Sequence, residues 1–270
     1  MNFKIIFPKK HLADYVRFFW FAEGDASLDR PYIHHAFAYT CPEFSFCYKG
    51  QFQYQSGSDL EKTLFPGVYG QTQTFSKVVS NAEFGIFGFY LYPQALSQLF
   101  CLPASELTNQ TVDTKTLCGK EGEILEENIM LASSMYERVN LASDFLEARL
   151  KNVRAPYSNM ISSITALSNL SPISAIKSLA EDSFLSVRQF ERRFKEFTGF
   201  RPKLYFRIAR FNSLLNKPFE NKSLAQIAYE YGYYDQSHFI HDFKNFSGCS
   251  PGAYFNQKTI NATDRGTVEY

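Results

Sequence analysis

Residues 189–206 read QFERRFKEFTGFRPKLYF, and residues 238–255 read HFIHDFKNFSGCSPGAYF. Eight of these eighteen positions are identical at a fixed offset of 49 residues: Phe190/Phe239, Phe194/Phe243, Lys195/Lys244, Phe197/Phe246, Gly199/Gly248, Pro202/Pro251, Tyr205/Tyr254 and Phe206/Phe255. Upstream, at an offset of 48, three further pairs correspond: Ile176/Leu224, Leu179/Ile227 and Ala180/Ala228. Self-similarity at a nearly fixed offset indicates that one supersecondary unit occurs twice.

Each copy predicts two short helices that are joined by a tight turn. In the second copy, Ser223 can cap the first helix, Gly232 can end it in the left-handed conformation, and Asp235 can cap the next helix. The second helix then carries aromatic residues at i, i+4 and i+7, which predicts a buried stripe. The stripe is Phe239, Phe243 and Phe246 in this copy, and Phe190, Phe194 and Phe197 in the other copy, where Ser186 is the cap. This pattern is typical of a helix-turn-helix unit.

The face opposite each aromatic stripe is polar and differs between the copies. With about 100° per residue, it carries Arg188, Glu191, Arg192 and Lys195 in the first copy, and Ser237, Ile240, His241 and Lys244 in the second. Arginine can bind guanine through two hydrogen bonds, glutamate can accept from cytosine, and isoleucine can contact a thymine methyl group. Lysines suit phosphates. For one amphipathic helix, a merely solvated face is the simpler explanation, but two copies favour double-stranded DNA as the partner.

Two histidines in the second unit raise the alternative of a metal site. His238 and His241 are three residues apart, but on the helical wheel they point in different directions. Asp235 serves better as a cap than as a third ligand. We therefore predict no metal, no cofactor and no catalytic residue here, with His241 as a DNA contact and His238 as a packing or capping residue.

Residues 223–255, SLAQIAYEYGYYDQSHFIHDFKNFSGCSPGAYF, resemble the signature of the AraC/XylS family of bacterial transcription regulators, and the resemblance extends over residues 157–256. It implies an all-α domain in which a central helix, at roughly 202–216, joins two helix-turn-helix units. The two recognition helices would then enter successive major grooves about 34 Å apart. The chain departs from the pattern at Ser183-Phe184, where a glycine is common.

The resemblance also implies the functional residues and partners. The DNA-binding set is Ser186, Arg188, Gln189, Glu191, Arg192 and Lys195 in the first recognition helix, and Gln236, Ser237, Ile240, His241 and Lys244 in the second. Members of the family usually activate transcription, often by contacting RNA polymerase. Activation is therefore expected more than repression.

Composition predicts a soluble globular protein in the cytoplasm. The chain has 270 residues, of which 45% are apolar and 20% are charged. Its five cysteines include no CxxC pair, which predicts reduced thiols rather than a zinc site or a disulfide framework. No run of 18 apolar residues occurs near the N-terminus, so no signal peptide and no contact with a membrane is expected. Residues 1–150 carry 12 basic and 17 acidic side chains, against 16 and 10 in residues 151–270.

Residues 1–150 predict a sensing or dimerising domain. Short aromatic and alternating runs come first and predict a β-barrel or sandwich, and helical periodicity follows from Pro93. The fold class is thus α+β. Aromatic residues that could line a pocket for a small-molecule effector are Trp20, Phe37, Tyr39, Phe46, Tyr48 and Phe89, with core filling as the alternative. The helical run 120–150 is either a homodimer surface or a cover for the core. Residues 151–156 are the predicted linker, and the junction between the two halves of the chain is expected around residues 151–171. Residues 257–270 are predicted to be a flexible tail.

Two other classes of protein compete with a DNA-binding regulator. A barrel enzyme fused to a DNA-binding domain would need a reactive thiol, but Pro42 interrupts the segment between Cys41 and Cys47. A protein-interaction module that no longer binds DNA would not need the basic residues Arg188 and Arg192. The sequence therefore predicts a regulator that is not an enzyme.

Overall fold

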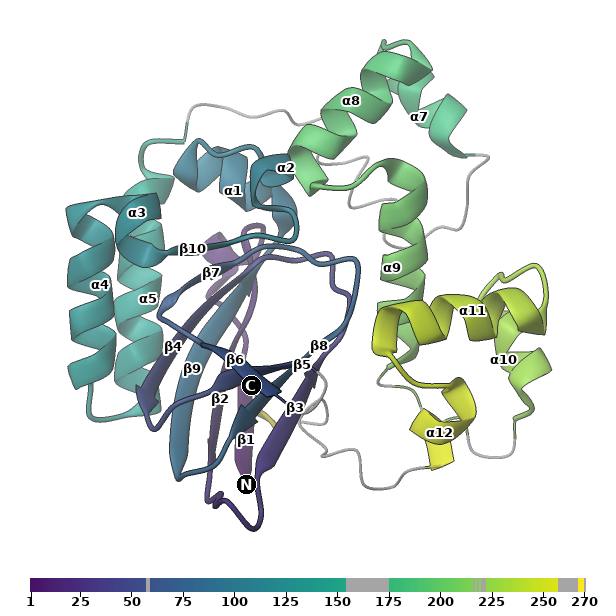
Figure 1. The fold of residues 1–270 in the computed structure, drawn as a ribbon. Helices are drawn as coiled ribbons and strands as arrows, with labels where there is room; N and C mark the ends of the chain where they lie inside the picture. Colours follow the sequence, from purple (N-terminus) through teal and green to yellow (C-terminus); the bar gives the residue numbers. More distant parts are fainter. Residues whose placement is uncertain are drawn as a thin grey trace.

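The computed structural model describes residues 1–56, 59–153, 175–215, 217, 219, 222–256 and 267–269. A β-rich part with its own helices comes first, and a purely helical part follows it (Figure 1). This arrangement confirms the predicted α+β class. Residues 154–174 lie outside the described residues, and with them most of the predicted linker and junction and the start of the predicted 157–256 domain.

The described strands of the N-terminal part form two sheets rather than one closed barrel. The larger sheet has the strand order β10 (Thr111–Asp113), β7 (Gly67–Tyr69), β4 (Glu43–Lys49), β9 (Phe84–Leu91), β2 (Val16–Gly24), β1 (Asn2–Ile6) and β11 (Thr267–Glu269). The smaller sheet has the order β3 (Tyr32–Ala36), β8 (Ser76–Ser80), β5 (Gln53–Ser56) and β6 (Asp59–Thr63). Of the two expected architectures, the protein has the sandwich.

Strand β11 corrects the prediction of a flexible C-terminal tail. Thr267, Val268 and Glu269 pair in parallel with Lys4, Ile5 and Ile6 at the edge of the larger sheet. An edge strand presents unpaired backbone N–H and C=O groups, which a passing segment with β-branched residues can satisfy. Residues 257–266 lie outside the described part of the chain.

One face of the larger sheet is covered by helices. These are the 3₁₀ turn Lys10–Leu12 and the helices α1 (Pro93–Phe100), α2 (Ala104–Leu107), α3 (Thr114–Cys118), α4 (Lys120–Leu131) and α5 (Met135–Leu150). Because successive side chains of a strand point to opposite faces, Phe44 and Phe46 of β4 pack against these helices. Glu43 and Ser45 face the smaller sheet instead and line the space between the two sheets.

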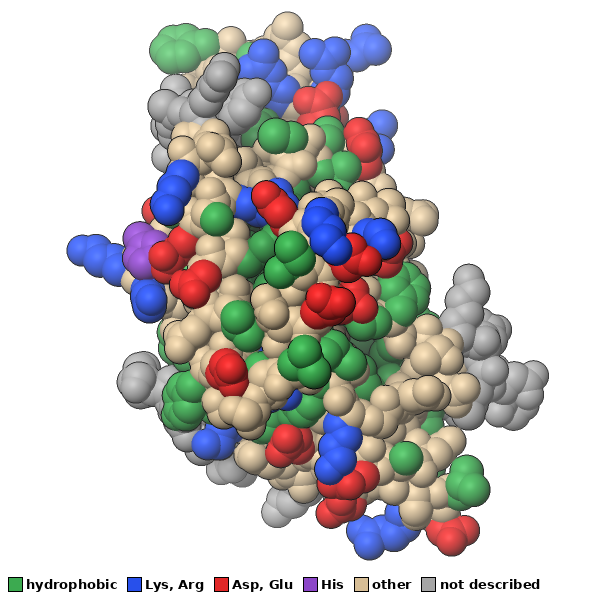
Figure 2. All heavy atoms as spheres, turned by 90° about the vertical axis from the view of Figure 1, so that its left-hand side faces the viewer, with side chains coloured by type: hydrophobic (Ala, Val, Ile, Leu, Met, Phe, Trp, Pro, Cys, Tyr) green, Lys and Arg blue, Asp and Glu red, His purple; other side chains and the backbone are tan. Residues whose placement is uncertain are grey.

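Helices α4 and α5 serve as a cover for the core. Leu125, Ile129, Ala142 and Leu146 are buried against the sheet in one hydrophobic cluster. Figure 2 looks onto this side of the molecule, where acidic, basic and scattered apolar side chains are interspersed. Leu131 is exposed at the end of α4. The covering role favours one of the two predicted alternatives, and a homodimer stays a prediction.

The C-terminal part is helical throughout its described elements apart from β11. It contains α7 (Ala175–Asp182), α8 (Val187–Thr198), α9 (Pro202–Leu214), α10 (Leu224–Glu230), α11 (Gln236–Ser247) and α12 (Pro251–Asn256). Helix α9 lies between the α7–α8 pair and the α10–α11 pair (Figure 1). The predicted aromatic stripes of both copies are buried in one cluster around Ile208 and Phe211 of α9. None of the described helices is both long and apolar enough to cross a bilayer.

Candidate nucleic-acid interface

A reciprocal cap begins one described helix in each unit. Ser186 Oγ accepts a hydrogen bond from the backbone N–H of Gln189 at 3.3 Å, and Gln189 Oε1 accepts from the backbone N–H of Ser186 at 3.0 Å. Ser223 and Gln226 form the same capping box at the start of α10. Helix α11 begins at Asp235, whose side chain accepts from the backbone N–H of His238 at 2.7 Å. Ser186 and Gln189, both predicted DNA contacts, thus have a capping role as well and remain exposed.

Equivalent residues end the two recognition helices. Gly199 and Gly248, paired in the duplication, have φ angles of 82° and 76° and stand at the C-caps of α8 and α11. The tight turn between the helices of each unit also contains a left-handed residue. In the second unit this is Gly232, with φ 67°, and in the first unit it is Phe184, with φ 53°. The bulky residue therefore takes the conformation that a glycine adopts in the other copy.

The predicted reading faces of α8 and α11 lie on the surface of the domain. Arg188, Arg192 and Lys195 are exposed on α8, while Glu191 is half-buried. On α11 the exposed residues are Gln236, Ser237, His241 and Lys244, while Ile240 is half-buried. Glu191 and Ile240 occupy the same position of the duplicated unit. The two faces therefore have the same pattern of exposed and half-buried positions but carry different side chains.

The outward side of α8 is rich in arginines. Helix α8 adds exposed Arg193, which the sequence reasoning did not single out, to its predicted cations. Arg192 forms only a long ion pair, 3.9 Å from Nε to Glu196 Oε1, between exposed side chains. A pair of this kind contributes little stability and leaves the guanidinium available to another anion.

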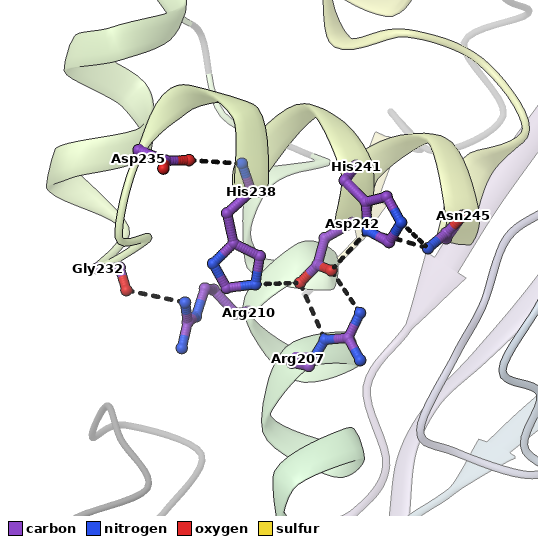
Figure 3. A network of polar contacts seen from close by, with 8 residues as sticks. All are labelled: Arg207, Arg210, Gly232, Asp235, His238, His241, Asp242 and Asn245. Atoms are coloured by element: carbon purple, nitrogen blue, oxygen red, sulfur yellow. Dashed lines mark hydrogen bonds and ion pairs between the residues drawn. The ribbon is translucent and has the colours of Figure 1, made fainter.

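A buried carboxylate in α11 was missed in the sequence. Asp242 is fully buried and accepts two hydrogen bonds from Arg207 of α9, at 2.5 Å to Oδ1 and 3.2 Å to Oδ2 (Figure 3). Hydrogen bonding to the Asp242 carboxylate raises the pKa of Arg207. A usable signal was present: Asp242 falls between Phe239 and Phe243 on the buried face, where an acid requires a cationic partner.

The two histidines of α11 lie around this carboxylate. His238 Nε2 is 3.6 Å from Asp242 Oδ2, and its ring contacts the edge of Tyr233. His241 lies within hydrogen-bond distance of Asn245 Nδ2, 3.2 Å from Nδ1 (Figure 3). These neighbours give His238 the packing role expected for it and leave His241 exposed on the outward face.

Helix α9 holds α11 in place through two arginines. Besides the Arg207–Asp242 pair, Arg210 Nη1 donates to the carbonyl of Gly232 at 2.8 Å and stacks over the ring of Tyr233. Residues 179–257 match the family model described as a helix-turn-helix domain. The C-terminal domain is an AraC-type helix-turn-helix domain. The chain is therefore a DNA-binding transcription regulator.

Comparisons with other proteins extend beyond the AraC-type domain. Residues 4–113 match a family described as a domain of unknown function (DUF6597). No curated protein matches the chain. Among solved structures, ToxT from Vibrio cholerae O395 is similar over 88% of this chain and 96% of its own, with 13% identity and a TM-score of 0.46. An unsaturated-fatty-acid-bound ToxT from strain SCE256 is similar over 88% and 94%, with 13% identity and a TM-score of 0.44.

The N-terminal domain touches the AraC-type domain at equivalent places in its two units. Thr108 Oγ1 donates to the carbonyl of Gly199 at 3.0 Å, at the end of α8. Ala38 donates its backbone N–H to the carbonyl of Phe246 at 2.9 Å, near the end of α11. Asn212 Nδ2 of α9 donates to the carbonyl of Ala38 at 2.8 Å. Both recognition helices and the helix between them are thus bound to the same domain.

A cavity of about 290 Å³ lies between the two sheets. Three of the predicted pocket residues, Trp20, Phe37 and Tyr39, line it. The other three are a correction: Phe46, Tyr48 and Phe89 lie on the opposite side of the larger sheet, in the cluster that packs against the helices. The strand register decides this, because one-residue alternation sends neighbours to opposite faces. Lining residues that the sequence reasoning missed are Arg17, Glu43, Tyr90 and Asn212.

The two cysteines named for the competing enzyme have different surroundings. Cys41 is buried, and its Sγ lies 3.8 Å from Arg17 Nη1. Burial raises the pKa of Cys47 to about 11, which keeps this thiol protonated near neutral pH.

Proposed function

We propose that this regulator reads DNA by placing α8 and α11 in successive major grooves, and that its N-terminal domain controls this reading through a small ligand or dimerisation. The observation that carries the proposal is the repeated outward face. Two helices with equivalent caps expose the same wheel positions, one with Arg188 and Arg192 and the other with Ser237 and His241. Each set suits hydrogen bonding to base edges.

The proposed contacts divide into base reading and phosphate binding. Arg188 and Arg192 would bind base edges, while Lys195 and Lys244, in the last turn of their helices, would bind phosphates on either side. Half-buried Glu191 and Ile240 would contact bases only when the helix lies deep in the groove. Two helices with different side chains on their faces favour an asymmetric binding site.

Control by the N-terminal domain is supported by its contacts to both units. Thr108 contacts the end of α8, and Ala38 contacts α11 near its end and is bound by Asn212 of α9. We therefore propose that docking restrains the AraC-type domain and that DNA binding requires the contacts at Ala38 and Thr108 to loosen.

The direction of regulation follows the family resemblance. We propose activation, with RNA polymerase as a protein partner and a homodimer as the assembly. The exposed aromatic side chains Phe184 and Tyr234, each at the turn of one unit, lie away from the docked N-terminal contacts and are open to a second protein.

Selection of genome fragments on the full chain, at fixed moderate salt, tests DNA reading. We expect one enriched motif with two half-sites about 10 base pairs apart. If no sequence were enriched, the outward faces would not read bases. The domain would then be a protein-interaction module instead. Analytical ultracentrifugation of the same sample, with and without the enriched site, measures the assembly that binds.

A further inference from the structure

A carboxylate faces the cavity of the N-terminal sandwich from the middle of an aromatic enclosure. Glu43 is on the cavity side of β4, directly opposite Tyr69 of β7 and Tyr90 of β9 in the sheet register. Cross-strand partners of this kind have adjacent side chains on the same face. Trp20 of β2 and Tyr54 of the smaller sheet line the same cavity.

No cation of the described residues neutralises this carboxylate. Within the described ranges, no lysine, arginine or histidine nitrogen forms an ion pair with Glu43, whereas exposed Glu83, Glu123 and Glu230 all have such partners. Burial raises the pKa of Glu43 to about 8, against the opposing effect of hydrogen bonding from Tyr90 and Trp20. A buried carboxyl that lacks a charged partner is an incomplete site, because ionisation there is unfavourable until a cation arrives.

The walls around Glu43 are suited to a cation as well. The indole ring of Trp20 stands over Gly88 of β9, where an added Cβ would lie 2.6 Å from Nε1. Aromatic faces carry the negative part of the ring quadrupole and attract ammonium groups. The Trp20 side chain also hydrogen-bonds to Glu43, so the indole and the carboxyl group form one polar end of the cavity.

The arginine of the cavity lining lies among aromatic rings and a thiol. Arg17 lies over the ring of Tyr39, 5.3 Å from the guanidinium carbon to the centroid, and over Phe18 at 5.9 Å. Its Nη1 is 3.8 Å from Cys41 Sγ. These neutral neighbours hold the guanidinium in place, and within the described residues it forms no ion pair with Glu43.

We propose that this cavity binds a small organic cation, a quaternary ammonium or a protonated amine, with the charged nitrogen between the Glu43 carboxylate and the ring of Trp20. The inference rests on the proposed control by a ligand and names the chemical class of that ligand. An anionic ligand at this end would meet both the carboxylate and the negative ring faces. A purely apolar ligand would gain nothing from the Glu43 carboxylate.

Cation binding at this site releases a proton below about pH 8. Since Glu43 is largely protonated in the empty cavity near neutral pH, a bound cation must ionise it, and affinity should rise about tenfold per pH unit between roughly pH 6 and pH 8. Several other groups that face the cavity have pKa values that are shifted away from this window. Burial raises the pKa of Tyr54 to about 12 and also raises the pKa of Tyr69. Burial lowers the pKa of His34 to about 4 and lowers that of His35 below its usual value. Arg17 stays charged, and Tyr90 hydrogen-bonds to Glu43 itself.

Calorimetry on the full chain without DNA tests the proposal with a matched pair of probes. Choline carries the trimethylammonium group, and 3,3-dimethylbutan-1-ol has the same shape with a neutral carbon in place of nitrogen. At about pH 8.5 we expect choline to bind at least about tenfold more tightly than the alcohol, with hexanoate not binding, and choline affinity to fall toward about pH 6.

Variants assign the binding to the enclosure. Glu43→Gln keeps the shape of the side chain and should weaken choline at least about tenfold at about pH 8.5, remove the pH dependence and leave the alcohol unchanged. Trp20→Phe, which keeps a ring, should weaken choline by about threefold. Glu83→Gln, at an exposed carboxylate that pairs with Lys49 outside the cavity lining, is the matched control and should change neither probe.

Equal binding of choline and its alcohol, tighter binding of hexanoate, unchanged choline affinity in Glu43→Gln, or no choline binding would each overturn the inference. The result is separable from DNA reading. A chain that enriches a DNA motif but fails to bind choline disproves the ligand class alone, and a chain that binds choline but enriches no motif disproves the DNA reading alone.

Discussion

Phe184 occupies a left-handed turn position with a side chain that is 91% exposed. A non-glycine residue in this region is strained, while glycine adopts it readily. Because little packing is lost, we expect Phe184→Gly to raise the free energy of unfolding of the AraC-type domain by about 1 kcal/mol, measured by urea denaturation of the full chain. The mirror variant, Gly232→Ala, should lower it by about 1 kcal/mol or more. A loss of stability in Phe184→Gly would contradict the assignment of strain.

Asp242 is the residue on which the second unit depends most. Removing one partner of a buried ion pair leaves the other uncompensated, at a cost of roughly 3–5 kcal/mol. Since the Arg207 side chain is 29% exposed and can regain water, we expect Asp242→Ala to lower the free energy of unfolding by about 3 kcal/mol. The exposed Lys222–Glu230 pair provides the control: Glu230→Ala should cost under about 1 kcal/mol. Equal losses in the two variants would mean that the Asp242 pair is not effectively buried.

Glu43 makes stability depend on pH in a defined direction. Its folded pKa, about 8, is above its ordinary value of 4.5, so the folded chain binds this proton more tightly than the unfolded chain. Its contribution to stability is therefore complete below about pH 4.5 and is lost as the pH rises to about 8. Relative to the natural chain, Glu43→Gln should gain about 1–2 kcal/mol between about pH 6.5 and pH 8 in urea denaturation. The lowered pKa of His34, about 4, acts below this range. A constant difference between the two proteins would refute the raised pKa.

At the scale of the element, α8 and α11 share a frame but should use their side chains differently. Arg192→Ala is expected to cost about 1–3 kcal/mol of specific binding and to relax the sequence preference, because a base contact is lost. Lys244→Ala should weaken binding to all sequences evenly and reduce the slope of log affinity against log salt by about one. Fluorescence anisotropy on the selected site and on scrambled DNA, over a salt series, measures both effects.

Arg193→Ala is the matched control on α8. It removes an exposed arginine of the same helix that lies outside the predicted reading face, so it should alter the salt slope without relaxing the sequence preference. If Arg192→Ala and Arg193→Ala gave the same uniform loss on every sequence, Arg192 would be a phosphate contact rather than a base contact.

At the scale of the whole molecule, one hydrogen bond connects the cavity rim with the helix between the two units. Asn212 lines the cavity and donates to the carbonyl of Ala38. If docking restrains DNA reading, Asn212→Ala should raise affinity for the selected site by about 2–10-fold, the equivalent of one net hydrogen bond of about 0.5–1.5 kcal/mol. Ser213→Ala, which loses a bond only within its own helix, should leave affinity unchanged. A lower affinity in Asn212→Ala would mean that docking prepares the helices for DNA instead.

The sequence by itself determined the features that depend on neighbours along the chain. Caps such as Ser186 and Asp235 act over three residues, and an aromatic stripe repeats with the helical turn, so both could be predicted from spacing alone. The duplication then identified the helix-turn-helix domain and its outward face. The strands of the first half were also recognisable, since alternation is local.

Only the tertiary structure decided which face of each strand meets the cavity and which distant residues meet one another. A shift of one residue in register reverses every side chain, so Glu43 rather than Phe46 faces the cavity. Asp242 finds Arg207 across 35 residues, and Asn212 finds Ala38 across 174. Such contacts depend on the packing of whole elements, because the free energy that holds them comes from burial shared by segments far apart in the chain.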